Sequence, residues 1–123
     1  MRTPPRILIV DDQPMNVDIL KTRLAVHGYE LLTATDGAEA LAIASARQPD
    51  LILMDIQLPI IDGYEAARRI KANPTLQHIP IIAVTSYALS GDDVKAFAAG
   101  CDAYVAKPFS PRALLAKVRE YLP

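Results

Sequence analysis

Ile-Leu-Ile-Val-Asp-Asp at residues 7–12 and Leu-Ile-Leu-Met-Asp at residues 51–55 are two short apolar runs that both end in aspartate. Runs this rich in Ile, Leu and Val are typical of parallel strands that are covered on both faces. Parallel strands end at a common edge of their sheet, where α/β proteins bind ligands. The two runs therefore predict an α/β fold with acidic side chains at its binding edge.

Apolar runs alternate along the chain with stretches whose apolar residues recur at helical spacing. Strict alternation predicts right-handed crossovers and one doubly wound parallel sheet with helices on both faces. The second strand has a mixed composition, which suits an edge position. The strands are predicted at residues 6–10, 30–35, 51–54, 81–84 and 103–106, and the helices at residues 14–27, 38–47, 64–72, 92–99 and 110–122.

At 123 residues the chain fits one domain, expected to span residues 1–123 without a second domain. The net charge of -1 leaves no broad positive surface for a nucleic acid. No apolar run approaches the roughly 18 to 20 residues that cross a bilayer, and no signal peptide opens the chain. The single cysteine, Cys101, suits a reducing compartment. We therefore expect a cytoplasmic protein whose partners are neither nucleic acid nor membrane.

The polar residues that stand out follow the predicted strands. Asp11 and Asp12 come after the first strand, Asp55 after the third, Thr85 after the fourth and Lys107 after the fifth. In an open α/β sheet these positions share one edge. With the strand order 2-1-3-4-5, the switch point falls between the first and third strands and brings the three aspartates together.

Three adjacent carboxylates repel one another unless a cation is bound among them. Carboxylate oxygens suit Mg²⁺, with Mn²⁺ able to substitute, whereas Zn²⁺ would require a Cys or His cluster that the sequence lacks. A carboxylate beside a metal can attack phosphorus and form an aspartyl phosphate. Lys107 and the Thr85 hydroxyl would then contact phosphate oxygens. The sequence therefore predicts a phosphoryl-accepting site.

Four stretches, in this order and at these intervals, resemble one family. The chain is similar over essentially its whole length to the receiver domains of response regulators of the CheY type, above all to stand-alone regulators of the DivK type and to receivers of hybrid histidine kinases. The resemblance implies a flavodoxin-like fold with five parallel strands and five helices. The stretches are Ile-Leu-Ile-Val-Asp-Asp (7–12), Leu-Ile-Leu-Met-Asp-Ile-Gln-Leu-Pro-Ile-Ile-Asp-Gly-Tyr (51–64), Ile-Ile-Ala-Val-Thr-Ser (81–86) and Gly-Cys-Asp-Ala-Tyr-Val-Ala-Lys-Pro-Phe (100–109).

The resemblance implies a role for each matching residue. Asp55 is the phosphoacceptor, Asp12 and the backbone carbonyl of Gln57 bind the metal with it, and Asp11 contributes through water. The remaining implied roles are the switch hydroxyl for Thr85, the aromatic that follows it inward for Tyr104, the phosphate contact for Lys107, and a cis peptide bond between Lys107 and Pro108.

Two positions are implied to set the rate at which the phosphoryl group is lost, and here they are Gln57 and Tyr87, neither of which is an acid. We hypothesise that the bulky Tyr87 hinders an attacking water. A Tyr87→Ala variant should then lose its phosphoryl group faster, and unchanged or slower loss would defeat the hypothesis.

The function implied by the resemblance is a phosphorylation switch. A histidine kinase or a histidine phosphotransfer protein donates the phosphoryl group, and the output is binding of an unidentified protein, or homodimerisation, through the fourth helix, fifth strand and fifth helix. The chain is then no enzyme beyond its own phosphorylation and dephosphorylation. Two alternatives stay open: a metal-dependent phosphatase for small molecules, which commonly carries an acid where Gln57 stands, and a binding module that works without phosphate.

Ordinary structural roles are the alternatives for single residues. Asp11 and Asp12 could cap a following helix, and Tyr104 could be plain core. Asp62, before Gly63, is predicted to be a cap or turn residue. The other structural predictions are a solvated helix face for Arg68, Arg69 and Lys71, and a small buried side chain for Cys101.

Overall fold

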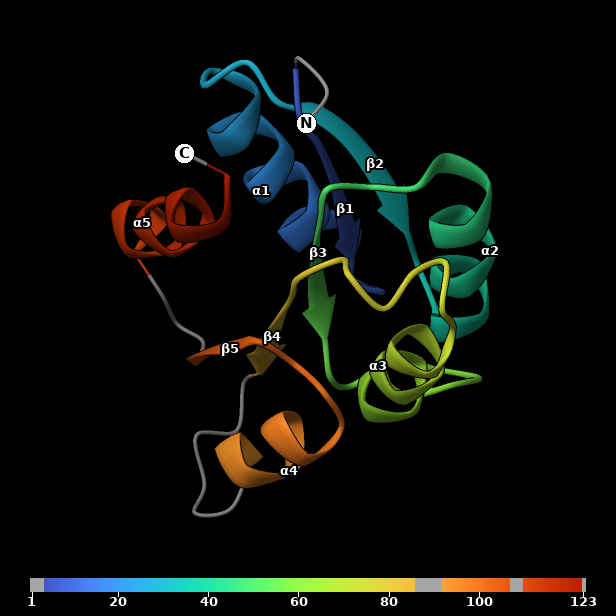
Figure 1. The fold of residues 1–123 in the computed structure, drawn as a ribbon. Coiled ribbons are helices and arrows are strands. Elements are labelled where there is room, and N and C mark those ends of the chain that lie inside the picture. Colours follow the sequence, from blue (N-terminus) through green and yellow to red (C-terminus); the bar gives the residue numbers. More distant parts are fainter. Residues whose placement is uncertain (1–3, 86–91, 107–109, 123) are drawn as a thin grey trace.

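The structure, a computed structural model, describes residues 4–85, 92–106 and 110–122. Strands and helices alternate strictly along this part of the chain (Figure 1). The strands are β1 (Arg6–Val10), β2 (Glu30–Ala34), β3 (Leu51–Asp55), β4 (Ile81–Thr85) and β5 (Ala103–Ala106). The helices are α1 (Pro14–Ala25), α2 (Gly37–Arg47), α3 (Gly63–Ala72), α4 (Asp92–Ala98) and α5 (Pro111–Tyr121).

The five strands form one parallel sheet in the order β2-β1-β3-β4-β5, as the sequence predicts. The mixed second strand lies at an edge, and β1 and β3 are neighbours at the switch point. All residues of β3 and β4 are buried, because helices cover both faces of these central strands.

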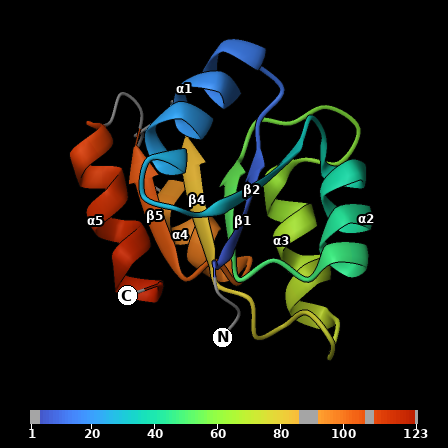
Figure 2. The same ribbon diagram turned by 90° about the horizontal axis from the view of Figure 1, so that it is seen from above.

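Each face of the sheet has its own core. Leu20 and Leu24 of α1 pack with Leu114 and Val118 of α5 on one face. Small residues of α2, α3 and α4, such as Ala40, pack on the other face. Figure 2 shows the sheet between these two helix layers, with α1 and α5 on one side and α2 and α3 on the other. Helices on both faces make the fold doubly wound.

Some strand and helix ends differ from the predicted ones by one or two residues, while β1 and β5 match them, and two of the differences matter. Asp55 and Thr85 are the last residues of β3 and β4 rather than the first residues after them. Asp55 still pairs with Val84, and Thr85 with Ala106. The parallel ladder therefore fixes the backbone of both residues. Elsewhere, α1 ends at Ala25, two residues before its predicted end.

Two aspartates fasten the N-terminal edge of the sheet in the same way. Asp50, directly before β3, donates its N–H to the Arg6 carbonyl (2.8 Å), and its Oδ2 accepts from the Arg6 N–H (2.7 Å). Asp102, directly before β5, makes the same two bonds with Ile81, both at 2.8 Å. Lys71 pairs with Asp102 Oδ2 at 3.0 Å. Each aspartate thus joins the start of its own strand to the first residue of a neighbouring strand.

Among the described residues, no helix has both the length and the apolar character that crossing a membrane requires.

Candidate functional site

Three aspartates meet at the C-terminal edge of the sheet. Val10 at the end of β1 pairs with Met54, the residue before Asp55, so Asp11 and Asp12 emerge beside the end of β3. One carboxylate oxygen from each of Asp11, Asp12 and Asp55 lies within 4.8 Å of the others. The acidic cluster predicted from the strand ends is therefore present.

Matching turns hold two of these carboxylates. Asp11 Oδ1 accepts from the Gln13 N–H at 2.9 Å, and Asp55 Oδ1 accepts from the Gln57 N–H at 3.0 Å. Each bond spans two residues, which is the pattern of an Asx-turn. Asp11 and Asp55 are 2% and 6% exposed, while Asp12 is half-buried. The turns limit the rotation of both buried carboxylates.

The helix-cap alternative for Asp11 and Asp12 does not hold. The N-cap of α1 is Gln13, and no side-chain hydrogen bond caps this helix. Asp62, by contrast, is the N-cap of α3, and its Oδ1 accepts from the Glu65 N–H at 2.9 Å. The sequence prediction for Asp62 is thus confirmed.

Gly63 lets α3 begin directly behind Asp55. A Cβ at residue 63 would lie 2.4 Å from the Asp55 carbonyl oxygen and 2.7 Å from Ile56 Cα. The Gly63 N–H donates to the Ile56 carbonyl at 2.9 Å, so loop 56–62 folds back on the end of β3. Only glycine permits this close backbone approach.

Thr85 and Tyr104, the predicted switch pair, share one face of the sheet. Tyr104 is opposite Ala83 and Thr85 is opposite Ala106, so strand alternation directs both side chains to the face that carries α2, α3 and α4. Thr85 is 2% exposed at the site edge, and the half-buried Tyr104 packs against the core of that face. Tyr104 is therefore both a core residue and a neighbour of the strand that carries Thr85.

Three residues named by the sequence analysis, Tyr87, Lys107 and Pro108, lie outside the described residues. The predicted tuning position, the predicted phosphate contact and the predicted cis peptide bond remain predictions for that reason.

The basic cluster on α3 divides into two kinds of side chain. Arg68 and Arg69 pair with Glu65 at 3.1 and 3.0 Å on the exposed face, and their hydrogen bonds lower the pKa of Glu65. Lys71 departs from the predicted solvated face: its side chain is 20% exposed and donates to the Ile79 carbonyl at 2.7 Å. Cys101 is buried as predicted.

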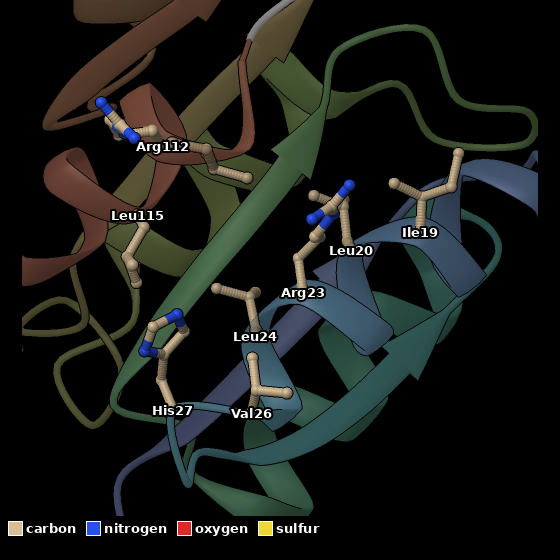
Figure 3. Close-up of a pocket in the computed structure, with 9 residues that line it drawn as sticks. Ile19, Leu20, Arg23, Leu24, Val26, His27, Arg112 and Leu115 are labelled. Carbon is tan, nitrogen blue, oxygen red and sulfur yellow. The ribbon is translucent and has the colours of Figure 1, made fainter.

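A hollow of about 240 Å³ between α1 and α5 was not predicted from the sequence. Figure 3 shows Leu24 on α1 pointing toward Leu115 on α5 across the hollow, which Ile19, Leu20 and the cationic Arg23 and Arg112 also line. The outward side of α1 is also apolar, because Met15 and Ile19 are 74% and 50% exposed. The only signal for this hollow in the sequence was that α1 carries apolar residues on two of its sides.

The donor set of the acidic cluster fits a hard divalent cation. Within the described residues this cluster is the one group of three or more His, Cys, Asp or Glu side chains close enough to share an ion. All three donors are carboxylates, which suit Mg²⁺ and Mn²⁺ rather than Zn²⁺. A doubly wound five-stranded sheet with this acidic switch point defines the CheY-like class of α/β proteins.

Comparisons with known proteins agree with that class. Residues 7–119 match the family described as the response regulator receiver domain, and the chain belongs to this family. It is 40% identical over 119 residues to the polar-differentiation response regulator DivK of Brucella anthropi, covering 97% of each chain. Receiver domains of response regulators are signalling proteins of two-component systems.

Solved structures of the same kind superpose closely. The receiver domain of a sensor histidine kinase from Pseudomonas aeruginosa, with a magnesium ion coordinated in its active site cleft, is 37% identical, with a TM-score of 0.89 over 96% of this chain and 97% of that one. The chemotaxis protein CheY4 of Vibrio cholerae is 29% identical, also with a TM-score of 0.89, over 95% and 98% of the two chains.

Proposed function

We propose that this protein is a phosphorylation switch in which Asp55 accepts a phosphoryl group from a histidine kinase or a histidine phosphotransfer protein. The observation that carries the proposal is the meeting of Asp11, Asp12 and Asp55 within 4.8 Å at the switch point. Family membership agrees with phosphorelay signalling.

Asp12, Asp55 and the backbone carbonyl of Gln57 would hold Mg²⁺ or Mn²⁺, with Asp11 contributing through water. When bound, the ion neutralises charge on the transferring phosphoryl group. A carboxylate oxygen of Asp55 forms a bond to phosphorus as the bond to the donor's imidazole nitrogen breaks, and the imidazole leaves with the bonding electron pair. The Asx-turn from the Gln57 N–H to Asp55 Oδ1 at 3.0 Å orients the attacking carboxylate for this displacement.

Thr85 and Tyr104 would carry the change away from the site. The Thr85 hydroxyl donates to a phosphoryl oxygen, and Tyr104 follows toward the space that Thr85 leaves, while Lys107 pairs with another oxygen. Both switch residues belong to the face of the sheet that carries α4, whose Val94 and Phe97 are 66% and 52% exposed. An apolar surface on α4 supports an output by binding a protein target or a second copy of the chain.

The phosphodonor would dock along α1. This helix begins two residues after Asp12, and the exposed Met15 and Ile19 lie on the same side, four residues apart. Arg23 and Arg112 border the hollow that Ile19 also lines (Figure 3). An apolar stripe with cations beside it suits a partner helix that offers apolar and acidic side chains.

The deciding experiment is treatment with acetyl phosphate and Mg²⁺, followed by intact mass measurement, on the protein and on Asp55→Asn. A gain of one phosphoryl group that needs both Mg²⁺ and Asp55 is expected. Multiple-turnover hydrolysis of a phosphate ester would instead favour a phosphatase, and no gain would favour a binding module that works without phosphate.

The α1 docking surface is tested separately with Ile19→Asp. Transfer from a phosphorylated histidine kinase or phosphotransfer protein should slow at least about tenfold, because a charge would be buried in an apolar contact. Phosphorylation by acetyl phosphate, which needs no docking, should keep its rate. Equal rates of partner transfer with and without the substitution would place the docking surface elsewhere.

A further inference from the structure

We infer that Gly37, the first residue of α2, is a positioning residue for the phosphoacceptor site. This helix carries none of the predicted site residues, so its contribution is indirect. The inference rests on the proposed function for its chemistry, because it concerns how the Asp55 and Gln57 ligands are held.

Gly37 lies against the loop that follows Asp55. A Cβ at residue 37 would lie 2.0 Å from the Ile61 carbonyl oxygen and 2.8 Å from both Ile61 C and Ile61 Cβ. These distances are well inside van der Waals contact, and two of the three atoms belong to the backbone. Any side chain at residue 37 must therefore displace either the first turn of α2 or loop 56–62.

Side-chain hydrogen bonds hold the first turn of α2 in place. Asp36 Oδ1 accepts from the Glu39 N–H at 2.7 Å, and Glu39 Oε1 accepts from the Thr35 N–H at 2.8 Å. The first bond caps the helix, and the second ties its first turn to the residue before the cap. Because this turn is held in place, a side chain added at Gly37 would push on loop 56–62.

The loop is already strained where Gly37 meets it. Ile60 has φ of 70°, and the Ile61 N–H donates to the Pro59 carbonyl at 2.8 Å, which defines a γ-turn of the rare positive-φ form. Ile is β-branched and costs free energy in this region, so neighbouring contacts must maintain the turn. Gly37 lies against Ile61, and Gly63 lies against Asp55 and Ile56.

The same short loop contains the metal-site backbone. Gln57 donates its N–H to Asp55 Oδ1, and the Leu58 N–H donates to the Ile56 carbonyl at 3.2 Å, so residues 55–58 form consecutive tight turns. Few flexible residues lie between Gln57 and Ile61, so a shift at Ile61 should be transmitted to Gln57. Mutation of residues that support metal ligands from outside the coordination shell typically costs 10–100-fold in metal affinity.

The test compares Gly37→Ala with Gly28→Ala. Gly28 has φ of 86° and no atom within 4 Å of its ideal Cβ, so alanine there strains the backbone without touching loop 56–62. Calorimetric titration with Mn²⁺ should show at least about tenfold weaker binding for Gly37→Ala. Gly28→Ala should bind Mn²⁺ like the unmodified protein despite its lower unfolding midpoint.

A second readout is independent of metal binding. In the metal-free protein, the Gln57 amide resonance should move in Gly37→Ala and stay in place in Gly28→Ala. Wild-type Mn²⁺ affinity in Gly37→Ala together with an unmoved Gln57 amide would overturn the inference. If the unmodified protein binds no Mn²⁺ through Asp55, the proposed function fails, while the Gln57 amide still decides the positioning role.

Asp36→Ala supplies a milder variant should Gly37→Ala not fold. It removes only the bond from the Glu39 N–H and loosens the turn that presses on Ile61. The Gln57 amide should move by a smaller amount, and no movement would again overturn the inference.

Discussion

The two edges of the sheet use the same residue type for opposite purposes. At the N-terminal edge, Asp50 and Asp102 each accept a backbone N–H at 2.7 and 2.8 Å, and Lys71 lies 3.0 Å from Asp102 Oδ2. At the C-terminal edge, Asp11, Asp12 and Asp55 lie within 4.8 Å of one another. Aspartate therefore ties strands together at one edge and concentrates negative charge at the other.

This difference shows that the N-terminal edge stabilises the fold, whereas the C-terminal edge gives up stability to bind a cation. A carboxylate that accepts from a largely buried N–H stabilises the folded state. Like charges brought together destabilise it until a cation binds. Neutralising an aspartate should thus lower the free energy of unfolding at the N-terminal edge and raise it at the C-terminal edge. Both changes can be measured directly.

The largest change in stability is expected for Asp102→Ala at the N-terminal edge. The substitution leaves the buried Ile81 N–H without its 2.8 Å acceptor and removes the carboxylate that pairs with Lys71. The free energy of unfolding should fall by about 2–3 kcal/mol, as for a buried donor that loses its acceptor. Urea denaturation measures it, and Asp18→Ala, on the exposed side of α1, is the control and should change by less than about 0.5 kcal/mol. If Asp102→Ala and Asp18→Ala lost equal stability, the hydrogen bond and ion pair of Asp102 would not stabilise the N-terminal edge.

A smaller effect of opposite sign is expected for Asp12→Asn at the C-terminal edge. In the presence of EDTA, relief of repulsion across at most 4.8 Å should raise the free energy of unfolding by about 1 kcal/mol, since Asp12 is partly exposed to water. The stabilisation gained on adding Mg²⁺ should shrink, because one ligand is lost. Denaturation with EDTA and with saturating Mg²⁺ gives both quantities. A less stable metal-free variant would mean that Asp12 holds the fold together as Asp102 does.

The acidic cluster was predictable from the sequence because two simple rules decide its position. Apolar runs define the strands, and parallel strands end at one edge, so Asp11, Asp12 and Asp55 had to share it. The same rules place Asp50 and Asp102 at the other edge, since they precede their strands. Their partners were not predictable, because the bonds of Asp50 to Arg6 and of Asp102 to Ile81 depend on strand register.

Other contacts lay beyond the local pattern. The approach of Gly37 to Ile61 joins a helix start to a distant loop, and periodicity carries no information about such a distance. Lys71 looked like its neighbours Arg68 and Arg69, yet it pairs with a residue 31 positions later. The exposed apolar side of α1 could not be recognised from the sequence, because the helix carries apolar residues that point both inward and outward.

At neutral pH the smallest effect is expected from titration of Cys101, which reports how tightly the N-terminal edge is closed. Burial, with a further contribution from Asp102, raises the pKa of the Cys101 thiol from 9.0 to about 11, while Lys71 opposes the rise. Because the pKa in the folded state is the higher one, this stabilising contribution is complete below about pH 9 and is lost as the pH rises through about 11. Substitution by alanine should therefore leave the pH dependence of stability unchanged near neutrality.

Between pH 9 and 11 the unmodified protein should lose more stability than Cys101→Ala. Lysines and tyrosines that titrate in the same range contribute equally to both proteins, so their contributions cancel in the comparison. A two-unit rise also leaves about 100-fold less thiolate than in a free thiol, so a thiol reagent should label the folded protein at least that much more slowly. Labelling should accelerate in Asp102→Ala, because loss of its bond to the Ile81 N–H loosens the edge that covers Cys101. Labelling of the intact protein at the rate of a free thiol would show that this edge opens readily, and that the bonds of Asp102 do not close it.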